Sequence, residues 1–189
     1  MPLAYPRAPV DDVRSADAEP VRSEPVPVGA ARFREALGRH ASGVAVVTVA
    51  GPGGPVGFTA TSFNSVSLDP PLVSFYLSRE SASWPAVRVA GHFAVNLLAA
   101  DQAALAARFA LPGADRFAPP TRWRAGPEGV PLLAGVTTQL VCAQRWTAPV
   151  GDHFLVMGTV VCTRVGAADT PLLHAGGRFG AFAPDPHRP

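Results

Sequence analysis

The fold of this chain is constrained most by strong turn signals that separate short apolar segments. The valine-rich segment 43–50 is followed by GPGGP at 51–55 and by a second segment at 56–62, which predicts a β-hairpin. Further strands are predicted at 72–77, 92–98, 132–150 and 153–165, giving about six in all. Because longer helical patterns do not alternate with these strands, we predict an antiparallel β-barrel with short inserted helices, and not a doubly wound parallel sheet.

Three short helices are predicted between the strands. The first runs from Ala30 to about His40, with apolar side chains at helical spacing. The second begins after Ser81 or Ser83, and the third is capped by Asp101. Residues 112–131 are predicted to form an irregular loop. That loop is longer than usual connections in compact domains, so we expect it to cover a site or an interface.

The chain is long enough for one sizeable core, because 48% of its 189 residues are hydrophobic. Residues 1–28 are rich in proline and lack apolar periodicity, which predicts a disordered or loosely packed tail. Residues 29–183 are predicted to form the domain, and residues 184–189 a flexible end.

Several functions are excluded by the residues that the sequence lacks. It contains no lysine, so neither a P-loop nor a pyridoxal phosphate Schiff base is available. The GPGGPVG segment fails the dinucleotide fingerprint because Val56 stands where the last glycine is needed. The histidines show no metal-ligand spacing, so no metal is expected. A net charge of +2 without a basic stripe argues against nucleic acid.

Membrane insertion and secretion are also disfavoured. No apolar run approaches the roughly 20 residues that a spanning helix needs. The N-terminus carries prolines and acidic residues where a signal peptide would have an apolar segment. We therefore expect a cytoplasmic protein without a membrane partner.

Small and hydroxyl side chains dominate the stretch that begins at Gly57 and reads GFTATSFNSVSLDPPLVSFYLS. Such a segment buries little core, but it lets a flat polar ligand lie against the backbone. The residues expected to line this ligand are Thr59, Ala60, Thr61, Ser62, Asn64 and Ser65.

A second polar segment follows the strand at 72–77. It combines serines with one arginine just before a predicted helix, which favours binding of an anion such as a phosphate. The serines also have a purely structural explanation, as caps of the helix. The residues concerned are Ser78, Arg79, Ser81 and Ser83.

Two further motifs carry polar groups near turns. His153 follows Gly151-Asp152 and can hydrogen-bond a nicotinamide or act as a proton donor, although an exposed histidine is often inert. Arg178 and Phe179 follow two glycines and offer a phosphate partner and a stacking face, although a tight surface turn explains the same pattern.

These segments in this order resemble the flavin reductase family, the short-chain NAD(P)H:flavin oxidoreductases that serve two-component flavin-dependent monooxygenases. The resemblance covers roughly four-fifths of the chain, from about Phe33 to Phe182. It rests on FREALGRHASGVAVVT, GFTATSFNSVSLDPPLVSFYL, SASW, FAVNLL, GDH and GGRFG.

The resemblance implies a homodimeric, six-stranded antiparallel split β-barrel of Greek-key type, the FMN-binding split barrel. It also implies roles for residues that occupy the motif positions. His153 resembles the catalytic histidine near the nicotinamide. The implied flavin-binding residues are Thr59, Ala60, Thr61, Ser62, Asn64, Ser65, Ser78, Arg79, Ser81, Ser83, Trp84, Arg178 and Phe179.

The function implied is transfer of a hydride from NADH or NADPH to FMN or FAD. The reduced flavin would then diffuse to a partner monooxygenase. Two alternatives remain at this point: a split-barrel flavoprotein that keeps its flavin and acts on a small molecule, and a non-catalytic module that binds flavin or haem. The choices between FMN and FAD, and between NADH and NADPH, stay open.

Overall fold

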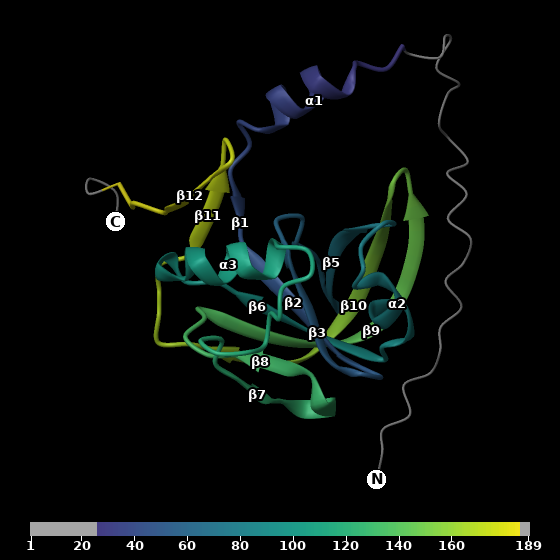
Figure 1. The fold of residues 1–189 in the computed structure, drawn as a ribbon, viewed down its shortest axis with the longest axis vertical. Coiled ribbons are helices and arrows are strands. Elements are labelled where there is room, and N and C mark those ends of the chain that lie inside the picture. The colour runs from purple at the N-terminus through teal and green to yellow at the C-terminus, as the bar shows by residue number, and fades with distance from the viewer. Residues whose placement is uncertain (1–25, 186–189) are drawn as a thin grey trace.

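The largest element of the computed structural model, which describes residues 26–185, is a seven-stranded antiparallel sheet (Figure 1). In spatial order its strands are β3 (Gly54–Ala60), β2 (Ala45–Gly51), β6 (His92–Leu97), β9 (Thr138–Val150), β10 (His153–Val165), β5 (Pro71–Ser78) and β4 (Asn64–Leu68). All its ladders are antiparallel, as short strands joined by tight turns predict. The central hairpin β9–β10 is the longest, with 13 residues in each strand.

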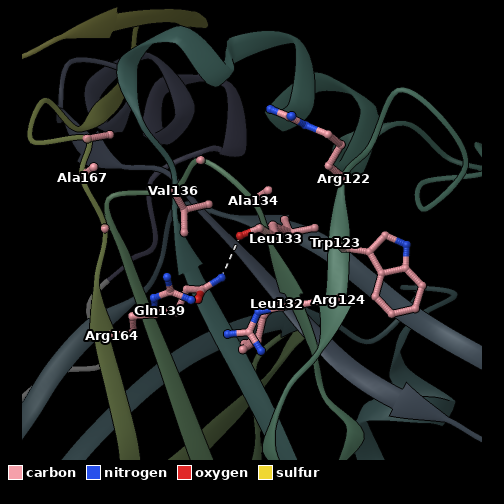
Figure 2. Close-up of a pocket in the computed structure, with 13 residues that line it drawn as sticks. Arg122, Trp123, Arg124, Leu132, Leu133, Ala134, Val136, Gln139, Arg164 and Ala167 are labelled. Atoms are coloured by element: carbon pink, nitrogen blue, oxygen red, sulfur yellow. Dashed lines mark hydrogen bonds between the residues drawn. The ribbon is translucent and has the colours of Figure 1, made fainter.

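Two smaller sheets flank the main one. The first contains β1 (Ser42–Gly43), β11 (Leu172–Ala175) and β12 (Arg178–Ala181). The second is a hairpin of β7 (Trp123–Ala125) and β8 (Pro131–Leu133), and it borders a cavity of about 470 Å³ (Figure 2). The helices are α1 (Ala30–Leu37), α2 (Trp84–Val89) and α3 (Ala103–Ala110), with 3₁₀ turns η1 (Ala100–Gln102) and η2 (Pro127–Gly129).

The two ends of the main sheet approach each other after β3 ends. The Ser62 hydroxyl accepts a hydrogen bond from the Tyr76 amide at 3.0 Å and donates one to the Tyr76 carbonyl at 3.3 Å. Behind this contact, the Phe58 ring of β3 lies 5.7 Å from the Phe75 ring of β5. The sheet therefore curves into a barrel in which residues 61–63 link the two end strands, β3 and β4, and no strand ladder joins β3 to β5 within residues 26–185.

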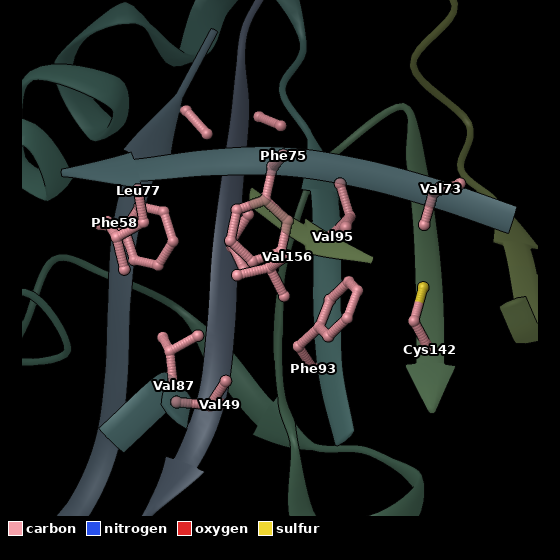
Figure 3. Packing of buried hydrophobic residues seen from close by; sticks show 13 residues of the cluster. Val49, Phe58, Val73, Phe75, Leu77, Val87, Phe93, Val95, Cys142 and Val156 are labelled. Carbon is pink, nitrogen blue, oxygen red and sulfur yellow. The ribbon is translucent and has the colours of Figure 1, made fainter. Parts of the chain in front are cut away.

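The main core fills the interior of this barrel (Figure 3). Phe75 and Phe93 are fully buried, and their rings meet edge to face with centroids 5.2 Å apart. Each such side chain contributes roughly 1.5–3 kcal/mol through burial. Gly158 on β10 makes room for Phe93, since a Cβ there would lie 2.6 Å from the Phe93 ring.

The predicted antiparallel split barrel is confirmed, with differences in its strands. The hydroxyl-rich stretch 57–67 is not one strand, because the chain leaves β3 at Ala60 and starts β4 at Asn64. Ser62 uses its hydroxyl on Tyr76 in the turn between them. This extra strand makes the main sheet seven-stranded where about six strands were predicted.

The segment 112–150 also differs from expectation. The predicted irregular loop 112–131 contains β7 and η2, and β8 begins at Pro131. The predicted strand 132–150 is divided, with β9 starting at Thr138. Local sequence does not reveal the β7–β8 hairpin, because its turn consists of a 3₁₀ segment in which Glu128 adopts a positive φ of 56°.

Two predicted helix ends are wrong. Asp101 does not cap a helix, since it lies inside η1, and α3 has no side-chain cap. The Gln102 side chain makes the hydrogen bonds at this junction. Its side-chain oxygen accepts a hydrogen bond from the Ala99 backbone amide at 3.0 Å, and its side-chain amide donates one to the Ala134 carbonyl at 2.8 Å. The first helix ends at Leu37 and not near His40, because Gly38 serves as its C-cap.

Most of the predicted N-terminal tail, residues 1–25, lies outside the described residues, as do residues 186–189 of the predicted C-terminal end. Between residues 26 and 185, no helix is long and apolar enough to cross a membrane. Within the same range, no group of three or more histidine, cysteine, aspartate or glutamate side chains is placed to hold a metal ion.

Candidate functional site

Strand β5 brings three of the four predicted polar segments together. Asn64 pairs with Ser74 of β5, Ser62 bonds the Tyr76 main chain, and Ser78 pairs with His153 of β10. Ser62 therefore contacts the strand two residues before Ser78, which corresponds to about 7 Å along a strand. The hydroxyl-rich turn, the serine–arginine loop and the histidine thus line one edge of the barrel.

The predicted ring-lining residues divide into two groups. Thr59 donates its hydroxyl to the Ala106 carbonyl of α3 at 2.6 Å, and Ala60 is buried in the main core. Their side chains consequently hold β3 in place. Thr61 and Ser65 are exposed, and the Asn64 amide donates to the Ser62 carbonyl at 3.0 Å, which stabilises the turn.

The backbone of β3 is the better ligand contact in this region. β3 is the last strand at one end of the main sheet, so one of its edges has no strand partner among the described residues. Groups on such an edge can hydrogen-bond a planar ligand, except that the Gly57 carbonyl already accepts a hydrogen bond from Arg116.

The serine–arginine loop is folded by its own hydroxyls. Ser78 Oγ accepts the Glu80 amide, and Ser81 Oγ accepts the Ser83 amide, each at 3.3 Å. A serine hydroxyl carries one donor in addition to its acceptors. Neither hydroxyl donates to another group within residues 26–185, so both protons are available to an anion. The exposed Arg79 adds a positive charge beside them.

The helix after this loop contributes less than the sequence indicated. α2 has only six residues, and Ser83 occupies its N-cap position without a side-chain cap bond. The Trp84 amide is already bonded to the Ser81 carbonyl at 2.9 Å. The groups that this loop offers to an anion are therefore the serine hydroxyls and Arg79 more than the helix dipole.

The Arg116 side chain holds the serine–arginine loop in place. Its Nη1 donates to the Gly57 carbonyl at 2.7 Å and lies 3.4 Å from the buried Ser83 hydroxyl, while Nη2 donates to the Leu111 carbonyl at 3.0 Å. Burial lowers the pKa of Arg116. Its buried Nε has no partner within the described residues. A cavity of about 250 Å³ opens between this side chain and Ser83.

His153 is oriented by the residue before it. Gly151, with a φ of 57°, allows the tight β9–β10 turn that places Asp152 Oδ1 2.6 Å from His153 Nδ1. The hydrogen bond from His153, followed by the charge of that ring, lowers the pKa of Asp152. With Nδ1 bonded to the carboxylate, Nε2 is the nitrogen left for a ligand.

An aromatic pair forms one wall of the site. The Trp84 and Phe154 rings are stacked, with centroids 3.7 Å apart and planes 9° from parallel. The Arg79 guanidinium carbon lies 5.5 Å from the centroid of Phe154. This contact holds Arg79 close to the β9–β10 turn, where a cation over an aromatic face is stabilised.

Arg178 and Phe179 are not brought to this cluster within one chain. Both lie on β12, where Phe179 packs against His174 with ring centroids 5.5 Å apart. Figure 1 shows the β11–β12 hairpin on the opposite side of the molecule from the tip of β9–β10.

Three residues of the site were not singled out from the sequence. Asp152 and Phe154 flank His153, and the GDH motif could have pointed to the first of them. Arg116 lies in the long segment 112–131, whose length was the signal that it covers a site. Its bond to Gly57 joins segments too distant in sequence for any local pattern to pair them.

Comparisons with known proteins agree with this architecture. Residues 37–183 match the flavin reductase like domain family. The chain is 42% identical over 151 residues to SmoA of Agrobacterium fabrum, named FMN reductase (NADH), covering 80% of this chain and 85% of that protein. It is 37% identical over 154 residues to HsaB of Rhodococcus jostii, a reductase subunit of a flavin-dependent monooxygenase, covering 82% and 78%.

A solved structure gives the same result. The NADH:FAD oxidoreductase SgcE6 of Streptomyces globisporus, in complex with NAD and FAD fragments, superposes with a TM-score of 0.77 at 38% identity. The match covers 82% of this chain and 94% of SgcE6. With the split barrel and the polar edge along β5 described above, the chain belongs to the flavin reductase family.

Proposed function

We propose that this chain transfers a hydride from NADH to FMN or FAD and supplies the reduced flavin to a partner monooxygenase. The observation that carries the proposal is the convergence on β5 of the hydroxyl-rich turn, the serine–arginine loop and His153. The names of SmoA, HsaB and SgcE6 supply the chemistry that is carried over to this chain.

The residues present fit a flavin. Ser78, Ser81 and Arg79 offer two hydroxyl protons and a guanidinium to its phosphate. The edge of β3 and the exposed Thr61 and Ser65 would hold its ring system. When bound there, the flavin supplies the group that accepts the hydride.

The chain's own residues position the reactants. Amide groups at the edge of β3 stabilise negative charge that develops on a ligand beside them. His153, with Nδ1 bonded to Asp152, presents Nε2 to the carboxamide of a nicotinamide or holds a proton there. The half-buried Arg116 side chain links the Gly57 carbonyl to the Ser83 hydroxyl and so supports the serine–arginine loop.

The same proposal includes a homodimer. No residue of α1 is buried, and Phe33 and Leu37 are 56% and 51% exposed. The Gly176 amide of the β11–β12 turn donates to the Gly38 carbonyl at 2.7 Å, which attaches the end of α1 to this hairpin, and the exposed apolar side chains of α1 and Phe179 are proposed as one interface surface. A second copy that covers this surface would bring Arg178 and Phe179 toward the partner's flavin.

We also place the reaction in the cytoplasm, where the nicotinamide nucleotides that drive it are maintained. The expected absence of a membrane partner and of nucleic acid belongs to the same proposal. It is supported by a net charge of +2 without a basic cluster along the sequence.

The experiment is a spectrophotometric assay of the purified chain that crosses NADH and NADPH with FMN, FAD and riboflavin. We expect oxidation of NADH with FMN or FAD, and loss of the flavin during gel filtration. Absence of turnover with every pair would refute the proposal. Flavin that survives gel filtration without NADH oxidation would identify a flavoprotein of another activity.

A further inference from the structure

A second cavity, of about 470 Å³, lies between two β-hairpins (Figure 2). One wall is the β7–β8 hairpin, and the other is formed by the beginning of β9, the end of β10 and residues 166–168. Arg164 at this cavity and His153 at the flavin site are on the same strand, separated by on the order of 35 Å along its length. The cavity shares no lining residue with the one beside Arg116.

Three arginines line the cavity. Arg122 and Arg124 lie two residues apart on either side of Trp123, so they share one face of the chain. The Trp123 ring is on the other face, where it packs against Phe117 with centroids 5.4 Å apart. Arg164 projects from the opposite wall, where it is the cross-strand partner of Gln139. Figure 2 shows Arg124 and Arg164 on either side of the cavity, near Gln139.

The charged residues that line this cavity are all positive. None of its thirteen lining residues is acidic. Within residues 26–185, the side chains of Arg122 and Arg164 form no ion pair or hydrogen bond, and Arg124 reaches only the Ala125 carbonyl at 3.3 Å. Three guanidinium groups in one site repel each other, and an anion that binds between them relieves this repulsion.

The floor of the cavity is preformed. Gln139 is 8% exposed, and its amide donates to the Leu133 carbonyl at 2.7 Å, which fixes both walls relative to each other. Leu132, Leu133 and Val136 supply apolar surface beneath it. A concave site of this size with apolar walls and a few convergent charged groups is typical of small-molecule binding.

We propose that this cavity binds a small organic anion with at least two negative charges, of the phosphate-ester or polycarboxylate class. Arg124 and Arg164 contact the charged groups, Arg122 lies at the rim, and the carbon skeleton of the anion rests on Leu132 and Val136. A single small ion leaves most of the 470 Å³ unfilled, so the volume favours an organic ligand.

The test uses the full-length chain at low ionic strength, with glycerol 3-phosphate, a phosphate ester, and citrate, a polycarboxylate, as separate titrants in isothermal calorimetry. We expect one site per chain for at least one titrant, with saturating FMN leaving its affinity unchanged. The titrant that binds more tightly assigns the class, phosphate ester or polycarboxylate. Because the experiment measures binding of the titrant, its result does not depend on whether the chain reduces flavin.

The variants are Arg124→Gln and Arg164→Gln, which remove the charge with little change in length. Each is expected to weaken titrant binding about tenfold or more, because a charge-assisted hydrogen bond is lost. Arg88→Gln, an exposed arginine on α2 that lines neither cavity, is the matched control and should bind as wild type.

Four results would overturn the proposal. They are binding of neither titrant, competition of the titrant with FMN, equal weakening in the Arg88→Gln control, and unchanged affinity in both cavity variants. The melting temperature of each variant is expected to lie within a few degrees of the wild-type value. Such a result shows that a loss of affinity is not caused by unfolding.

Discussion

Ser78 and His153 lie directly opposite each other across β5 and β10, so the loop that offers hydroxyl protons and the histidine share one end of the barrel. The pairing also fixes Arg79, whose amide donates to the Asp152 carbonyl at 3.0 Å. A phosphate group and a nicotinamide bound at this end would therefore be positioned by the same two strands.

His153→Ala is expected to slow flavin reduction by about ten- to a hundredfold while changing flavin affinity less than about threefold, because in the proposed function the imidazole acts on the nicotinamide. Stopped-flow reduction and fluorescence titration of FMN measure the two effects separately. Equal losses in both measurements would contradict this placement. Asp152→Asn keeps the ring but weakens its orientation, so its rate should fall between those of wild type and His153→Ala.

The Asp152 carboxyl should titrate below its ordinary pKa of 3.8, because the hydrogen bond from His153 favours the ionised form. A group with a depressed folded-state pKa contributes to folding above that ordinary value, and the contribution is lost as the pH falls through the lower, folded-state pKa. Carbon-13 NMR titration of the carboxyl follows this directly. In His153→Ala the pKa should return toward 3.8, and an unchanged pKa would show that the hydrogen bond is not its cause.

Arg116→Gln should lower the free energy of unfolding by about 1.5–3 kcal/mol, because the carbonyls of Gly57 and Leu111 lose a charged donor. Urea denaturation with linear extrapolation measures the change. FMN affinity should also fall, since Ser83 loses its support. Arg88→Gln on the same assays serves as the control, and equal losses in the two variants would point to charge alone.

Gly158→Ala should destabilise the barrel by about 1–3 kcal/mol, because the new methyl group would meet the Phe93 ring and the Ala143 carbonyl. Gly91→Ala is the matched control, since a Cβ there has no neighbour within 4 Å. Thermal melting of the two variants should separate them clearly. Similar melting temperatures would mean that Phe93 moves aside without strain.

Phe33→Glu should shift the chain from dimer to monomer in light scattering coupled to gel filtration, because a charge would replace apolar surface on α1. Leu68→Glu, at a 92% exposed position on β4, is the control and should leave the mass unchanged. A wild-type mass of one chain would contradict the proposed homodimer.

The sequence predicts the barrel, and the polar segments that converge on β5, because their signals are local. The valine-rich run at 43–50 and the Gly-Pro turn at 51–55 predict β2 and β3, and the serines predict the loop that begins at Ser78. The turn at Asp69-Pro70 likewise predicts the β4–β5 connection, although the separate strand β4 was missed.

Contacts between distant segments could not be predicted in this way. Nothing near Arg116 in the sequence indicates that its guanidinium reaches Gly57, and nothing near Thr59 indicates that its hydroxyl is bound to Ala106. The convergence of Arg124 and Arg164 depends on the register of β9 with β10 and on the position of the β7–β8 hairpin. Tertiary packing determines all three.

The contact between Ser62 and Tyr76 has a consequence for the lifetime of the protein. It lies where residues 61–63 link the two end strands of the sheet, β3 and β4, which form no ladder with each other, so a ligand bound across this seam would stabilise the barrel. A ligand at about 100 times its dissociation constant adds roughly 2.7 kcal/mol to folding. The resistance of this chain to cellular proteases should therefore rise and fall with the supply of free flavin.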